Sequence, residues 1–232
     1  MSRRALDVAG VVLASALFGV GCSSTSHDDG LKPYPHAEPE SQGGGALYPA
    51  GPYGVNKGSI VDNFSFTGYA DPSVDTAALV PIALADFYNE TGDDVYPEGS
   101  PHGAGNPKPR ALLIDVGSSW CGPCQQEASS VLPGKYAELA PRGAEFLFQL
   151  FDGPETGKNA TEKDLKAWTK KFKSNYPSVI DPARQLAALF DPSAVPANFI
   201  IDTRTMELVE LVIGAPSETF WSKFEATLDS GE

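Results

Sequence analysis

From residue 58 onward, short apolar runs alternate with segments in which apolar residues recur at every third or fourth position. The runs indicate strands and the spaced segments indicate helices, because the two structures have different side-chain periods. The expected elements are a strand at 60–66, a helix or helix-like turn at 77–88, a strand at 111–116, a helix at 125–140, a strand at 144–151, a helix from Thr161, a short helix at 181–190, strands at 198–202 and 207–213, and a helix at 217–228. With the short 181–190 helix set aside, the order from 111 is strand, helix, strand, helix, strand, strand, helix.

The segment after Thr161 shows how clear the helical pattern is. Thr161 is a suitable N-cap, and Leu165, Trp168 and Phe172 then share one helical face. Off this face lie Lys166, Lys170, Lys171 and Lys173, which we expect to face water.

The first residues have the order of a signal segment. Ser2-Arg3-Arg4 is basic, an apolar run extends from Val8 to Gly21, and Cys22 follows. The run is too short to span a bilayer comfortably. Its end resembles a bacterial lipoprotein leader, in which cleavage before the cysteine precedes lipidation of the sulfur. We therefore expect residues 1–22 to be a leader and Cys22 to carry the lipid, with a soluble secreted protein as the alternative.

This resemblance has consequences for location. It implies the periplasmic side of a bacterial cell envelope, and Ser23 resembles the pattern of retention at the outer rather than the inner membrane. Residues 23–57 are rich in Ser, Gly, Pro and Asp, a composition that buries too little apolar surface to offset its ordering entropy. We expect this segment to be a flexible tether and residues 58–232 to form one domain.

The formal net charge of −13 argues against nucleic acid as a partner, because phosphate binding needs a basic face. Among the three cysteines, Cys22 is assigned to the lipid, which leaves Cys121 and Cys124. Export places these two in an oxidising compartment. A zinc half-site and a structural disulfide are the alternatives to a redox pair, but zinc needs two further ligands that the sequence does not offer nearby. We expect no bound metal and no cofactor.

Trp120-Cys121-Gly122-Pro123-Cys124, after the apolar run at 111–116, resembles the thioredoxin active site residue for residue. The resemblance implies a thioredoxin-like α/β fold, a three-layer α/β/α sandwich with a central mixed sheet. The chain is most similar to exported TlpA/ResA-type thiol-disulfide oxidoreductases, which have an extra segment, here 152–192. Glu127 also matches their acidic position, whereas Ser129 stands where they commonly have proline.

The resemblance also implies roles for single residues. Cys121, at a helix start that favours its thiolate, is the nucleophile, and Cys124 resolves the mixed disulfide. Asp115 lies where thioredoxin has a buried carboxylate that accepts the proton of the resolving thiol; an exposed strand-end Asp is the alternative. Val195-Pro196 resembles the cis-proline loop that binds client backbone; an ordinary trans turn is the alternative. Trp120 is either an apolar client-binding surface or a packing residue.

The resemblance therefore implies an enzyme that reduces disulfides of exported client proteins. It needs electrons from a membrane-bound donor, and we expect a monomer. One alternative is a copper-binding metallochaperone, although no histidine follows His102. The other is a thiol peroxidase, although such enzymes have a threonine at the position that Ser118 occupies here.

Overall fold

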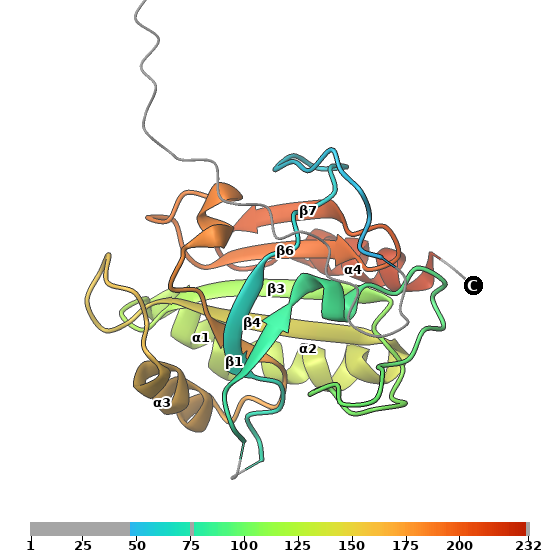
Figure 1. The fold of residues 1–232 in the computed structure, drawn as a ribbon. Coiled ribbons are helices and arrows are strands. Elements are labelled where there is room, and N and C mark those ends of the chain that lie inside the picture. Colours follow the sequence, from blue (N-terminus) through green and yellow to red (C-terminus); the bar gives the residue numbers. More distant parts are fainter. Residues whose placement is uncertain (1–46, 75–76, 231–232) are drawn as a thin grey trace, which may run out of the picture. The chain divides into compact units, whose positions relative to one another are not determined.

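The computed structural model describes residues 47–74 and 77–230; the predicted leader, Cys22 and most of the predicted tether lie outside this range. Its seven strands form one mixed sheet in the order β2-β1-β5-β4-β3-β6-β7 (Figure 1). The strands are β1 Ser65–Tyr69, β2 Val80–Ala83, β3 Ala111–Ser118, β4 Ala144–Asp152, β5 Ser178–Ile180, β6 Ala197–Asp202 and β7 Glu207–Ile213. The helices are α1 Gly122–Ser130, α2 Leu132–Leu139, α3 Glu162–Phe172 and α4 Glu218–Asp229, with short 3-10 helices η1 Leu84–Phe87, η2 Ala140–Arg142 and η3 Gln185–Ala188.

The centre of the sheet is β3, which runs parallel to β4 and antiparallel to β6. All eight of its residues are buried, and alternate side chains enter two separate cores. The face of Leu113 is covered by α1, α2, α3 and α4, and Figure 1 shows α1, α2 and α3 below the sheet. The face of Leu112 is covered by η1, η3 and irregular segments. The expected α/β class with a mixed central sheet is confirmed, and its second outer layer consists of short 3-10 helices and irregular segments.

The helix expected over 77–88 is wrong for its first half, which is strand β2, while η1 agrees with the helix-like turn. Ile82 pairs with Phe66 of β1 and is fully buried. The Asp86 carboxylate accepts the Ala83 N–H at 2.8 Å and fixes the start of η1. Strand pairing with a distant segment therefore overrides the local helical spacing.

The helix expected over 125–140 is two helices, α1 and α2. Val131, at the junction, has φ −114° and ψ −62°. Pro133 lies in the first turn of α2, where its missing N–H costs no helical hydrogen bond. Proline thus starts a new helix here and does not simply kink the first one.

The helix expected over 181–190 is also wrong, because only η3 forms. Arg184 has a left-handed backbone with φ 54°, which interrupts helical geometry directly before η3. The buried Asp181 carboxylate accepts the Leu186 N–H at 3.0 Å and fixes the turn. Strand β5 was not expected; its three residues pair with both β4 and β1.

The residues before 58 that the structure describes take part in packing. Tyr48 is buried, and its hydroxyl donates to the Val61 carbonyl oxygen at 2.7 Å. Ile60 bridges to both Tyr53 and Glu207. Among residues 47–74 and 77–230, no helix combines the length and apolar character needed to cross a membrane.

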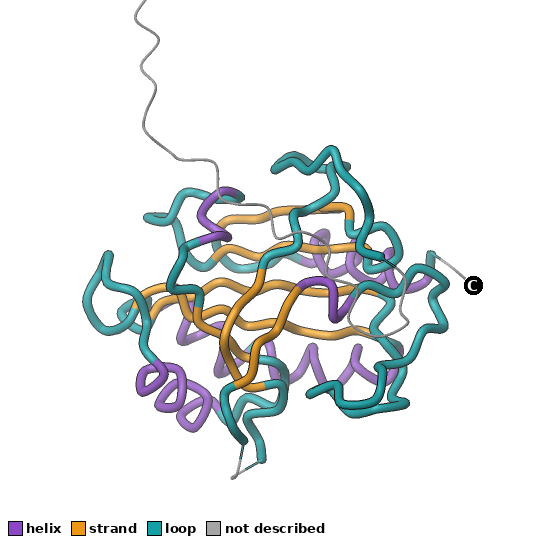
Figure 2. Tube along the Cα trace, in the orientation of Figure 1, coloured by secondary structure: helices purple, strands orange, loops and turns teal. Residues whose placement is uncertain are grey.

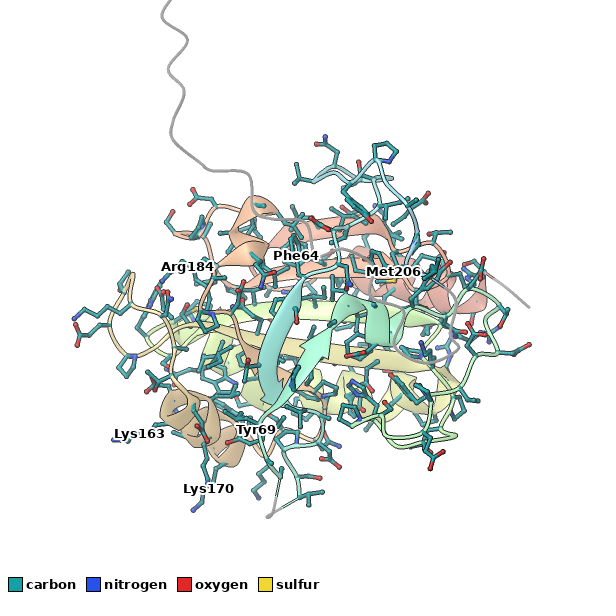
Figure 3. The ribbon with its side chains drawn as sticks, viewed as in Figure 1. Phe64, Tyr69, Lys163, Lys170, Arg184 and Met206 are labelled. Atoms are coloured by element: carbon teal, nitrogen blue, oxygen red, sulfur yellow. A yellow bond between two sulfur atoms is a disulfide. The ribbon has the colours of Figure 1, made fainter. Side chains whose placement is uncertain are left out.

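Two further features place the site. The loop after β4, drawn in teal in Figure 2, lies where β3 leads into α1, because Ser119 N–H donates to the Asp152 carbonyl oxygen at 3.0 Å. On α3, Lys163 and Lys170 point away from the sheet in Figure 3, as expected for the solvated face.

Candidate active site

Cys121 and Cys124 form a disulfide at the start of α1, with an S–S distance of 2.01 Å and a Cα–Cα distance of 5.3 Å. Cys121 is the N-cap of α1, and its sulfur accepts the Cys124 N–H at 3.1 Å. Pro123 lies in the first helical turn, where its missing N–H is tolerated. In the reduced protein the same N–H and the positive end of the helix would favour a thiolate at Cys121.

Both cysteines are nearly buried, at 3% exposure each. The Val195-Pro196 loop covers the cysteine pair on one side. Its peptide bond is cis, as predicted from the resemblance to thioredoxin. The Val195 carbonyl oxygen lies 3.6 Å from Cys121 Sγ. In the disulfide this is a van der Waals contact, and in the dithiol the Cys121 thiol can donate to that oxygen. The cis-proline loop and the disulfide are therefore in direct contact.

Asp115 lies on the helix-covered face of β3, the face whose core includes both cysteines, and it is 4% exposed, so the exposed alternative is excluded. Asn198 of β6 is its strand neighbour, and Glu127 projects from α1 with 2% exposure. Asp115 Oδ1 and both Glu127 carboxylate oxygens have no hydrogen-bond partner of ordinary geometry among the described residues. Two carboxyl groups are thus enclosed in one desolvated space.

This enclosure changes the acidity of both groups. Burial raises the pKa of Asp115 well above its ordinary value of 3.8, and the nearby Glu127 charge raises it further. Burial also raises the pKa of Glu127 from 4.5 to about 7, an effect that the neighbouring Asn198 side chain partly opposes. A carboxylate whose pKa is raised by burial is a stronger proton acceptor than an exposed one, which suits thiol chemistry.

Sequence reasoning noted Glu127 only as a family match and missed Asn198. A signal was present, because Asn198 is a polar residue within the apolar run at 197–201 and faces the same side as Ile200.

Trp120 is partly buried beside the cysteine cluster. Its indole N–H donates to the Asp152 carboxylate at 3.2 Å. The same carboxylate forms an ion pair with Arg184. Sequence reasoning predicted Trp120 at the site but neither of these two partners.

Among residues 47–74 and 77–230, no group of three or more His, Cys, Asp or Glu side chains is arranged to hold a metal ion. His102 is buried and stacks on Tyr96, with ring centroids 4.9 Å apart, and also packs against Phe87. Ser118 is fully buried, and its hydroxyl accepts the Asp152 N–H at 3.3 Å.

Comparisons with known proteins agree with this geometry. The AhpC/TSA family model matches residues 107–207, less than half of the chain. The thiol-disulfide oxidoreductase ResA of Bacillus subtilis (strain 168) is 23% identical over 127 residues, which span 54% of this chain and 65% of ResA, slightly under two thirds of its length.

Two solved structures share the fold. One, from Chlorobium tepidum, is assigned as the thiol:disulfide interchange protein DsbE and has a TM-score of 0.53 at 20% identity, covering 75% of this chain and 99% of its own. A secreted thiol-disulfide isomerase from Corynebacterium glutamicum has a TM-score of 0.51 at 17% identity, covering 80% and 99%.

The fold is thioredoxin-like, and it carries a Cys-x-x-Cys pair that forms a disulfide in this structure. The expected similarity to thiol-disulfide oxidoreductases is confirmed by the match to ResA, and the DsbE structure shares the fold. The cysteine pair at disulfide distance supports redox chemistry, and the metallochaperone and peroxidase alternatives are not favoured.

Proposed function

We propose that this protein is a thiol-disulfide oxidoreductase that reduces disulfides of exported client proteins. The observation that carries the proposal is the disulfide of Cys121 and Cys124 at a helix start, in contact with a cis-proline loop. A helix start supplies the N–H groups and the positive dipole end that activate a thiol. The names of ResA and the DsbE-type neighbour agree with this chemistry.

The reaction balances in two exchanges. The Cys121 thiolate attacks one sulfur of the client disulfide, forms a mixed disulfide and expels the other client sulfur as a thiolate. Cys124, as a thiolate, then attacks Cys121 Sγ, which closes the Cys121–Cys124 disulfide and releases the second client thiolate. Two electrons pass to the client, and an external dithiol must reduce the protein again.

The second exchange requires Cys124 to lose a proton in a nearly dry site. Asp115 is assigned as the acceptor, with Glu127 beside it as the group that controls its charge state. Because two neighbouring buried carboxylates repel each other, the pair favours sharing one proton over losing both. That arrangement leaves one carboxylate able to accept the proton of the Cys124 thiol.

Client binding is assigned to the surface around Cys121. The Val195 carbonyl beside Pro196 is available to pair with the backbone of an extended client segment. Trp120 supplies a partly exposed apolar surface next to the nucleophile.

We assign the protein to the extracytoplasmic side of a bacterial envelope, in line with a relative described as secreted. The finer proposals are lipidation at Cys22, outer-membrane anchoring, a membrane-bound electron donor and a monomeric state. Residues 1–22 remain the proposed leader, followed by a tether. The proposed tether spans residues 23–57 and the proposed domain 58–232, and the burial of Tyr48 supports extending that domain back to about residue 47.

The test is insulin reduction driven by dithiothreitol with residues 23–232. Wild type should accelerate it, and Cys121→Ser should not, because the attacking sulfur is absent. Cys124→Ser should accumulate the mixed disulfide, which allows bound clients to be identified. Equal rates for wild type and Cys121→Ser would refute the proposal. Stoichiometric copper binding by the reduced protein, without insulin reduction, would favour the metallochaperone.

A further inference from the structure

Asp152 is a buried carboxylate that joins three segments around the disulfide. It ends β4 and is 2% exposed. One oxygen accepts the Trp120 indole N–H at 3.2 Å and the Gly157 backbone N–H at 2.8 Å. The other oxygen accepts a hydrogen bond from Arg184 within an ion pair. A single carboxylate thus ties the start of α1, the loop after β4 and the segment before η3.

The Arg184 side chain is held on several sides. Its guanidinium lies 4.2 Å above the ring centroid of Phe151, and its Nε donates to the Asn159 side-chain oxygen. Asn159 in turn donates to the Pro182 carbonyl oxygen at 2.7 Å. The backbone of Arg184 adopts φ 54°, a conformation that L residues rarely adopt unless their surroundings hold them there. Figure 3 labels Arg184 at the start of η3.

The ion pair of Asp152 and Arg184, here called the bridge, connects segments on two sides of Cys121 Sγ. Trp120 directly precedes Cys121, whereas the segment that begins at Arg184 leads through η3 to the Val195-Pro196 loop, which contacts the same sulfur. An ion pair at a buried position is weak evidence for stability, because desolvation offsets much of its attraction. Its geometric effect is distinct, because it joins the carboxylate that holds the Trp120 indole to the segment that leads to the Val195-Pro196 loop.

We propose that Asp152 and Arg184 are positioning residues that set client affinity by holding Trp120 in place relative to the cis-proline loop. This inference rests on the proposed function, in which Trp120 and Val195-Pro196 bind the client. Neither residue touches the reacting sulfurs in the contacts described. They act through Trp120 and through the segment that leads to Pro196.

Three variants test the bridge in the chain from residue 23 onward. Arg184→Met retains an apolar stem over Phe151 without the charge, Arg184→Lys retains the charge without the planar fork, and Asp152→Asn removes the anionic acceptor. Arg142→Met is the matched control, because Arg142 pairs with Glu225 and Asp229 at distances of 2.9 and 3.1 Å, outside the site.

Arg184→Met and Asp152→Asn should raise the KM for insulin about tenfold with kcat near wild type, which is less than the roughly hundredfold cost of a 1 Å misplacement. The Trp120 indole signal in ¹⁵N NMR spectra, assigned with Trp120→Phe, should move in both variants and move less in Arg184→Lys. Arg142→Met should change neither quantity.

The following outcomes separate the proposed function from the positioning role. If wild type does not reduce insulin, the proposed function fails, and an unmoved Trp120 signal would independently overturn the bridge. If wild type is active but Arg184→Met has the KM and the Trp120 signal of the control, positioning is overturned while the function stands. A lowered melting temperature with an unmoved Trp120 signal would mark the bridge as structural only. Should Asp152→Asn not fold, the two Arg184 variants decide the question.

Discussion

Replacing Glu127 by Gln isolates the effect of burying a carboxyl group beneath the disulfide. Glu127 is 2% exposed and has no hydrogen-bond partner of ordinary geometry in the described part of the chain. Because its pKa is raised from 4.5 to about 7, the folded state keeps the proton to a higher pH than the unfolded state does. Glutamine has nearly the same shape but does not titrate.

The sign and size of the pH dependence of the free energy of unfolding follow from proton linkage. Below about pH 4.5 both states hold the proton, and the full contribution of Glu127 to stability is present. As the pH rises through about 7, the folded state must release the proton into a dry site, so the free energy of unfolding falls. At about 1.36 kcal/mol per pKa unit, the rise from 4.5 to about 7 corresponds to about 3 kcal/mol. The Glu127→Gln variant does not lose this stability as the pH rises, because glutamine does not titrate.

Urea unfolding of the oxidised protein at a series of pH values from 4 to 8 measures the effect. The free energy of unfolding of Glu127→Gln minus that of wild type should increase by about 3 kcal/mol across the range. Glu138→Gln, which changes an exposed carboxylate on α2, serves as the control, and its difference from wild type should show no comparable rise. A flat or falling difference for Glu127→Gln would show that the carboxyl is hydrated or paired in solution, which refutes the argument.

Two further predictions follow from the same structure. Asp115→Asn should slow the release of the client from the Cys121 mixed disulfide by roughly a hundredfold, the lower end of what general bases contribute, and stopped-flow measurement of that step at pH 7 tests it; an unchanged rate would assign the proton acceptor elsewhere. Tyr48→Phe removes the hydroxyl that donates to Val61 and should lower the free energy of unfolding by about 1 kcal/mol in urea titration, whereas no change would place the domain boundary after Tyr48.

Local patterns were sufficient where one segment determines its own structure. The N-cap at Thr161, the apolar face of α3 and the buried run of β3 could all be predicted, because each depends on neighbouring residues. The Cys121–Cys124 pair and the cis bond before Pro196 could be predicted through the resemblance to thioredoxin. Local patterns failed where pairing with a distant strand determines the structure. This is the case at β2, which pairs with β1, and at β5, which lies between two strands.

The sequence by itself determined the reactive pair, the helix start that activates it and the acidic character of the chain, because these depend on residue type and short-range spacing. Only the tertiary structure decided that Asp115 and Glu127 share a dry space and that Asp152 receives both Trp120 and Arg184. The physical reason is that desolvation and ion pairing depend on which distant segments enclose a group. That enclosure is fixed by the packing of helices and strands against one another and not by the local order of residues.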